Sequence, residues 1–126
     1  MEGAFAEWFP NGRKLSEGAY ASGLRTGTWT QWREDGSVET TFPFEAGKVQ
    51  GVAERRYPSG AVAWRTSFVA GRREGPSVEY RLDGRKKSEG TYREDRMEGP
   101  WTFWSEDGEV DREKTGNYAQ GKRTEG

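Results

Sequence analysis

The segment GTWTQWREDGSVETTFPFEAGK, residues 27–48, holds two turn signals on either side of a run of strand-forming residues. Asp35-Gly36 is a dipeptide typical of type I′ hairpin turns, and Gly47-Lys48 follows half a repeat later. The flanking residues are rich in aromatic, Val and Thr side chains, which favour strands. A helix is disfavoured because each interior glycine would cost about 1 kcal/mol. The segment therefore predicts two antiparallel strands.

The same pattern recurs along the whole chain with a period of 24 residues. The first glycine of each unit is Gly3, Gly27, Gly51, Gly75 or Gly99, and the aromatic near its end is Tyr20, Phe44, Phe68, Tyr92 or Tyr118. Self-similarity at a fixed period identifies a repeat protein. We predict one repeat domain over residues 1–126, with units 3–26, 27–50, 51–74, 75–98 and 99–126. The expected fold is all-β, an elongated twisted single-layer antiparallel β-meander built from five β-hairpin repeats.

If every connection is a two-residue turn, adjacent strands stack without a change of register. The first glycine of each unit then faces an aromatic residue on both neighbouring strands, as Gly27 would face Phe44 and Tyr20. A ring that covers the bare backbone of a cross-strand glycine shields it from water. The alternative is that this glycine merely ends a turn.

The aromatic residues divide between the two faces of the predicted sheet. By strand alternation Phe5, Trp29, Phe42 and Trp101 share one face. The opposite face receives Trp8, Trp32, Tyr80 and Trp104, unless a β-bulge redirects that set.

Composition argues against an enzyme. The chain has no histidine and no cysteine, which removes the commonest general base, the commonest metal ligand and any thiol nucleophile. Asp35, Asp83 and Asp107 are explained by turns, and a glycosidase-type acid pair is the remaining enzymatic alternative. No glycine motif precedes a helical pattern, so we expect no phosphate loop. We expect no catalytic residues, no metal site, no cofactor and no small-molecule substrate.

Charge and hydropathy restrict the possible partners. Twenty basic and 21 acidic residues give a net charge of −1, so nucleic acid and anionic lipid are unfavoured partners. The start MEGAFAEWFP lacks a basic segment followed by an apolar run, and no stretch has the ~20 apolar residues of a membrane span. We therefore expect a cytoplasmic protein.

The third unit differs from the others in two respects. Five arginines against two glutamates give it a charge of +3, and Ala53, Thr66, Ser77 and Gly90 form a run of small residues between Phe42 and Trp101. Small residues between rings predict a notch, and aromatic and arginine side chains beside a depression are typical of an interface hot spot. The predicted partner-binding residues are Arg55, Tyr57, Trp64, Phe68, Trp29, Phe42 and Trp101. The alternative is that unit three has degenerated and its arginines form ordinary cross-strand pairs.

Four motifs resemble the MORN-repeat superfamily: GTWTQWREDG, GPWTFWSEDG, EGTYREDRMEG and GNYAQGKRTEG. They are most similar to its bacterial variant family, whose unit reads Gly-x-Trp-x-x-Trp/Tyr, Asn/Asp-Gly and Tyr-x-x-Gly-Lys. The match covers residues 3–126 and is poorest in unit three. The resemblance implies a β-hairpin repeat sheet. Variant members are often described as antitoxins, and classical members as membrane-associated or scaffolding modules.

Three functions compete at this level. The leading hypothesis is a non-enzymatic protein-binding module, including an antitoxin or immunity-type protein that covers a toxin or effector. The second is a structural scaffold, a homo-oligomer that assembles through its exposed edge strands. The third is binding of nucleic acid or anionic lipid through the unit-three arginines, against which the near-zero net charge argues.

Overall fold

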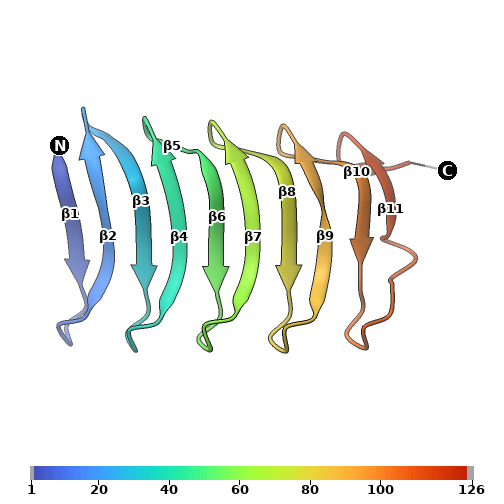
Figure 1. Cartoon of the computed structure of the whole chain (residues 1–126), viewed down its shortest axis with the longest axis horizontal. Helices are drawn as coiled ribbons and strands as arrows, with labels where there is room; N and C mark the ends of the chain where they lie inside the picture. Colours follow the sequence, from blue (N-terminus) through green and yellow to red (C-terminus); the bar gives the residue numbers. More distant parts are fainter. Residues whose placement is uncertain (1, 125–126) are drawn as a thin grey trace.

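The computed structural model describes residues 2–124, and the regular structure within them consists of β-strands in one open antiparallel sheet (Figure 1). The strands are β1 (Gly3–Trp8), β2 (Lys14–Ala21), β3 (Leu24–Trp32), β4 (Val38–Glu45), β5 (Lys48–Val49), β6 (Gly51–Arg56), β7 (Val62–Val69), β8 (Arg72–Tyr80), β9 (Lys86–Arg93), β10 (Arg96–Phe103), β11 (Gly116–Ala119) and β12 (Lys122–Arg123). Neighbours in sequence are neighbours in the sheet, with the short β5 paired to β4 beside β6. The two ends of the chain lie at opposite ends of the row (Figure 1). The predicted all-β meander is confirmed; residues 125 and 126 of the fifth unit lie outside the described residues.

Within each hairpin the register is the one predicted from the turn spacing. Gly27 faces Phe44 and Trp29 faces Phe42 in the pairing of β3 with β4. The first hairpin repeats this arrangement, with Gly3 opposite Tyr20. Two strands that leave one short turn have no freedom to slip, so local sequence is sufficient to set this register.

The dipeptide Asp35-Gly36 and its equivalents predicted type I′ turns, and this prediction is wrong. Only Gly36 has a positive φ, of 92°, and the Arg33 amide donates to the Ser37 carbonyl at 2.8 Å. This is a three-residue loop in which a type I turn precedes a glycine bulge. The Asp35 carboxylate accepts a hydrogen bond from the Ser37 amide at 2.8 Å, which stabilises the looser turn.

Type I′ turns lie at the other end of the strands, between units. Ala46 and Gly47 have φ values of 48° and 83°, and Glu45 pairs with Lys48 across them. The turn is thus centred one residue earlier than predicted. Asp95 occupies the glycine position of the fourth such turn, with a φ of 70°.

The register between units differs from the prediction. Tyr20 pairs with Arg25 rather than with Gly27, and a bulge follows before Glu17 pairs with Thr30. Gly27 itself has a φ of 70°, and open space surrounds the position of its missing side chain. The glycine is therefore required by the left-handed backbone of the bulge, and no ring covers it.

A ring does cover a glycine, but in the neighbouring column. A Cβ built on Gly18 would lie 2.1 Å from the Trp29 ring, and one on Gly90 would lie 2.1 Å from the Trp101 ring. Neither glycine has a positive φ, so close ring approach is the reason for its identity. Rings that cover glycines are therefore present, as predicted. The glycines that they cover are not the first glycines of the units, because the inter-unit bulge shifts the strands.

The thin core is built from inter-unit pairs of complementary size. Thr66 pairs with Ser77 across two units. Continuing the strand pairing by one residue at the other junctions places Gly18 opposite Trp29, Phe42 opposite Ala53, and Gly90 opposite Trp101. Three pairs join a ring to a small residue, and Ala53 is fully buried as a result. The fourth pair has no ring, and its two hydroxyls lie 2.8 Å apart. The predicted notch is therefore open at Thr66–Ser77, while Phe42 fills the space beside Ala53.

Hydrogen bonds at the bulged turns tie successive units together. Arg33 Nη2 donates to the Arg56 carbonyl at 2.9 Å, and the Tyr57 hydroxyl donates to the Tyr80 carbonyl at 2.7 Å. A register shift also interrupts each of the first four hairpins at this end, between Gln31 and Trp32 for example. The sequence placed Trp8, Trp32, Tyr80 and Trp104 on the opposite face unless a β-bulge redirected them, and this register shift is such a bulge.

No helix among the described residues has both the length and the apolar composition needed to cross a membrane.

Candidate functional site

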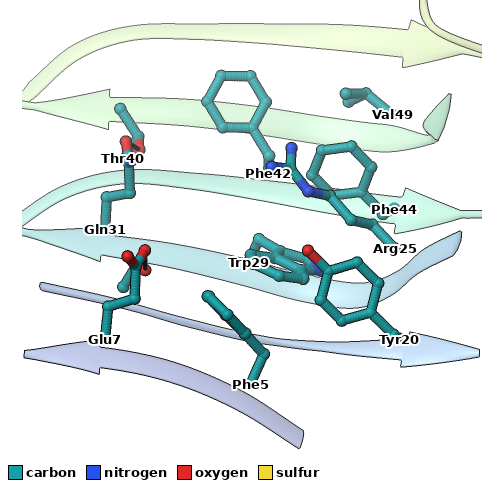
Figure 2. A pocket seen from close by; sticks show the side chains of 11 residues that line it. Phe5, Glu7, Tyr20, Arg25, Trp29, Gln31, Thr40, Phe42, Phe44 and Val49 are labelled. Atoms are coloured by element: carbon teal, nitrogen blue, oxygen red, sulfur yellow. Dashed lines mark hydrogen bonds between the residues drawn. The ribbon is translucent and has the colours of Figure 1, made fainter. Parts of the chain in front are cut away.

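One face of the sheet, here called the aromatic face, bears Phe5, Trp29, Phe42, Trp64 and Trp101 and contains two hollows. The N-terminal hollow has a volume of 380 Å³ and the central hollow one of 280 Å³. The N-terminal hollow is lined by Phe5, Glu7, Ser16, Tyr20, Arg25, Trp29, Gln31, Thr40, Phe42, Phe44 and Val49 (Figure 2). The central hollow is lined by Trp64, Thr66, Phe68, Arg73, Ser77, Glu79, Ser88, Tyr92 and Trp101.

Trp29 is the centre of the N-terminal hollow. Only 9% of its surface is exposed, because one ring face lies against the bare backbone of Gly18. Its Nε1 donates to the Ala19 carbonyl at 3.2 Å, and the ring centroids of Phe5 and Tyr20 lie 5.5 and 5.2 Å from it. Trp29 is therefore a rigid part of the floor, and it fixes the positions of the more exposed rings around it.

Arg25 lies over the aromatic rings of this hollow. Its guanidinium carbon is 4.8 Å from the Trp29 ring centroid and 5.4 Å from that of Phe44, which is cation–π geometry. Among residues 2–124 no carboxylate lies within ion-pair distance of Arg25. The hollow therefore contains a positioned cation whose charge is not neutralised by the surrounding chain.

Polar side chains form a separate row in the N-terminal hollow, away from Arg25 (Figure 2). The buried Ser16 hydroxyl donates to Glu7 Oε1 at 3.0 Å. The Thr40 hydroxyl donates to Gln31 Oε1 at 3.2 Å, which leaves the Gln31 amide group as a donor. The hollow thus has an aromatic centre with a cation on one side and polar groups on the other.

The central hollow repeats the main parts of this arrangement. Trp101 lies on Gly90, is 4% exposed, and donates from Nε1 to the Thr91 carbonyl at 2.9 Å. The Ser88 hydroxyl donates to Glu79 Oε1 at 3.4 Å. The floor differs, since the Thr66–Ser77 pair replaces a ring.

The arginine of the central hollow is already paired. The Arg73 guanidinium carbon lies 4.2 Å from the Tyr92 ring centroid, but its Nε is 3.1 Å from Asp95 Oδ1. Hydrogen bonds from the Arg73 amide and side chain hold the pKa of Asp95 below its ordinary value. Asp95 is therefore a carboxylate at neutral pH, and it neutralises Arg73.

The two hollows are separated by a pair of rings. Phe42 lines the first, Trp64 lines the second, and their centroids lie 6.0 Å apart in an edge-on arrangement. A ligand that fills both hollows would therefore cross this pair.

Five of the seven predicted partner-binding residues line the hollows. Trp64, Phe68 and Trp101 lie in the central hollow, and Trp29 and Phe42 lie in the N-terminal hollow. The interpretation based on unit three thus located one part of a longer surface.

Arg55 and Tyr57 line neither hollow. Arg55 faces Trp64 across the ladder, but its guanidinium reaches away to lie 3.7 Å from the Glu39 carboxylate. Tyr57 follows the end of β6, where the register shift and its bond to the Tyr80 carbonyl hold it at the turn. The bulge explains why alternation along an unbroken strand misplaced Tyr57.

Two further unit-three arginines, Arg56 and Arg65, lie on the opposite face, as the alternation of side chains predicts. Arg56 and Arg65 both bind Glu54, at 2.7 and 2.8 Å. Burial acts to raise the pKa of Glu54, but the hydrogen bonds from Arg65 and Arg56 outweigh it, and the pKa is lowered. The Arg65–Glu54 pair is a cross-strand pair of the kind that the alternative interpretation of unit three expected, whereas Arg56 binds Glu54 from the same strand.

Arg25, Glu7 and the matching Arg73 and Glu79 are site residues that sequence reasoning missed. A signal for the glutamates was present, since Glu7, Ser16, Tyr20 and Trp29 recur three units later as Glu79, Ser88, Tyr92 and Trp101. The arginines recur at a different spacing, because Arg73 lies two units after Arg25. A charged constellation repeated together with its rings indicates a shared surface.

No protein-family model matches the chain, and no similar sequence was found among curated proteins. The likeness to MORN repeats therefore depends on the quoted motifs alone. Among residues 2–124 no group of three acidic side chains is arranged to hold a metal ion.

Proposed function

We propose that the protein is a non-enzymatic binding module whose aromatic face holds an extended segment of a partner protein. The supporting observation is the pair of adjacent hollows, both lined by rings, on a sheet that has no second layer in the described chain. A layer of side chains that covers no core of its own is free to contact another molecule. Rings and arginines are the residues that contribute most to protein interfaces.

The size of the hollows favours side chains of a polypeptide as their contents. Volumes of 380 and 280 Å³ are at or below the low end of the range for small-molecule pockets. Two such hollows in a row, separated by the Phe42–Trp64 pair, suit two anchor residues on one chain.

The motif resemblance supports a narrower form of the proposal. We propose that the chain is a bacterial MORN-repeat variant that acts in the cytoplasm as an antitoxin or immunity-type protein. The hairpin repeat sheet is consistent with that family, and binding of a toxin would use the aromatic face.

Nucleic-acid or anionic-lipid binding through unit three is disfavoured by the charges. Arg56 and Arg65 are paired with Glu54, and Arg73 is paired with Asp95. Arginines that are already neutralised release fewer counterions from a polyanion, so little affinity is left.

Assembly into a scaffold has one supporting feature. Within residues 2–124 the six-residue strand β1 pairs with β2 alone, which leaves its other edge without a partner strand there (Figure 1). An open edge can pair with a second copy. Mass measured by sedimentation over a range of concentrations would detect such assembly.

Selection from a displayed peptide library tests the proposal and does not require the partner to be identified first. Peptides enriched on the wild type should bind Trp64→Ala about 2 kcal/mol more weakly, roughly 30-fold, because Trp64 separates and lines the hollows. Trp8→Ala is the matched control, since Trp8 is 59% exposed and lines neither hollow. Circular dichroism would establish that both variants keep the sheet. Failure to enrich any peptide, or enriched peptides that bind Trp64→Ala normally, would contradict the proposal.

A further inference from the structure

The two hollows share their rings and carboxylates but differ in net charge. Each has a tryptophan on a bare glycine, a serine bonded to a glutamate, and an arginine over a ring. In the central hollow Asp95 neutralises the arginine, whereas Arg25 in the N-terminal hollow has no acidic partner among residues 2–124. Arg25 thus lacks the carboxylate partner that Arg73 has in Asp95, a turn residue beside the central hollow.

We propose that the N-terminal hollow binds an acidic side chain of the partner segment, with Arg25 as the carboxylate-binding group and the half-buried rings of Phe42 and Phe44 as the surface for the apolar residue beside it. This rests on the proposed function and specifies which segment the aromatic face accepts. For Arg73, Asp95 at the adjacent turn already supplies, from within the chain, the carboxylate that the partner supplies to Arg25.

The ring faces exclude the opposite choice, a cationic ligand. A lysine or arginine of the partner would bind best over Trp29 or Phe44, but the Arg25 guanidinium already lies over both. A second cation there would meet like charge at short range. An anion instead gains a charge-assisted bond, and the planar guanidinium matches a carboxylate in two-point geometry.

The arrangement of the hollow also orients the ligand. Figure 2 shows three rows across the strands: Glu7, Gln31 and Thr40 form the first, Phe5, Trp29 and Phe42 the second, and Tyr20, Phe44, Arg25 and Val49 the third. The Arg25 side chain reaches from the third row toward the second, and its guanidinium lies between Phe42 and Phe44 (Figure 2). The acidic group therefore belongs at this guanidinium, with the apolar residue against the neighbouring rings. Glu7 in the first row accepts a donor and repels a second acid, so a single acidic residue beside an apolar one is the best match.

Two capped peptides that differ in one group test this inference. Ac-GSFESG-NH2 carries the carboxylate and Ac-GSFQSG-NH2 the neutral isostere. Binding is followed by the ¹⁵N NMR shift of the Trp29 indole N–H. We expect the acidic peptide to bind about tenfold more tightly at low salt, the size of one bond to a charged group, and the preference to shrink as ionic strength rises.

Substitutions test which residue causes the preference for the acidic peptide. Arg25→Met should abolish the difference between the two peptides, and methionine is tolerated because Met97 occupies the equivalent position of unit four. Arg25→Lys keeps the positive charge and should retain part of the difference between the two peptides. Arg72→Met is the matched control, since it removes the same charge from an exposed arginine that lines neither hollow.

The outcomes separate this inference from the proposed function. Equal binding of the two peptides at Trp29, or a preference that survives Arg25→Met, overturns the acidic segment but leaves the aromatic face as a binding surface. If neither peptide binds, the inference of an acidic segment is also overturned. If library selection also enriches nothing, the proposed function fails with it.

Discussion

The N-terminal and central hollows are two related surfaces of one repeat array. Glu7, Ser16 and Trp29 recur 72 residues later in the central hollow, whereas its arginine, Arg73, lies 48 residues after Arg25. The N-terminal hollow has five rings and an arginine without an acidic partner among residues 2–124. The central hollow replaces the Phe5 ring by Ser77 and neutralises its arginine with Asp95. The comparison shows how a repeat array diversifies, since the scaffold residues Gly and Trp are kept while neighbours change shape and charge.

The contact of a tryptophan ring with a bare glycine, which both hollows share, should be the most sensitive part of the molecule. Gly18→Ala places a methyl group about where the Trp29 ring lies, and Phe5, Tyr20 and Phe44 block the ring from moving. We expect unfolding free energy to fall by roughly 3 kcal/mol, the upper part of the range for overpacking. Urea denaturation followed by fluorescence measures it.

A double-mutant cycle supplies the control for that prediction. In a Trp29→Ala background the added methyl group has room, so Gly18→Ala should cost little, and the two substitutions should couple strongly. Gly90→Ala should behave like Gly18→Ala because Trp101 repeats the contact. Additive effects would contradict the packing of ring on backbone.

The charge difference between the hollows should be removable by one substitution. Asp95→Gly restores the residue found at the equivalent turns and frees Arg73, so the central hollow should gain about tenfold affinity for the acidic peptide. Isothermal titration should then report two sites per chain instead of one. A variant that still binds one acidic peptide would show that the Asp95 carboxylate does not distinguish the hollows.

The shape difference should be removable as well. Thr66→Gly with Ser77→Trp copies the Gly18–Trp29 pair into the notch at the same register. Burial of a new ring is worth about 2 kcal/mol, partly offset by about 1 kcal/mol for glycine in a strand, so stability should rise by about 1 kcal/mol. The new ring should close the central hollow to peptides and leave the N-terminal hollow unaffected, as NMR shifts of Trp101 and Trp29 would reveal. Continued binding at Trp101 would refute the role of the notch.

The smallest effect concerns unit three, which joins the hollows. The pKa of Glu54 is lowered in the folded state, because bonds from Arg65 and Arg56 outweigh its burial. Its contribution to stability is therefore complete above the ordinary glutamate pKa and is lost as pH falls through the lowered value. Glu54→Gln should flatten this acid-side loss when urea midpoints are compared between pH 7 and pH 3. An unchanged profile would remove Glu54 as the group responsible.

The turn spacing was enough to predict the hairpins, because each intra-unit pair such as Gly27–Phe44 depends on residues fewer than 20 apart. It failed between units, where Tyr20 meets Arg25. The reason is that a bulge adds residues to one strand, and a glycine required by positive φ is indistinguishable in sequence from one required by a nearby ring.

The rings of the site were predictable for a similar reason, and its charges were not. Trp64, Phe68 and Trp101 follow from alternation along strands. Whether an arginine is neutralised depends on a turn residue more than 20 positions away, as with Arg73 and Asp95. The identity of the arginine alone carries no information on that contact.

The amino-acid sequence alone determined the architecture: 24-residue periodicity, turn glycines and strand-forming side chains leave an open antiparallel meander as the consistent outcome, since all of these signals are local. Tertiary structure alone decided which glycines lie beneath rings, that the notch opens at Thr66–Ser77, and that Arg25 has no carboxylate beside it among residues 2–124 while Arg73 does. Those features arise where bulges bring separate units together, and the energy of each contact depends on the partner that the bulge places there.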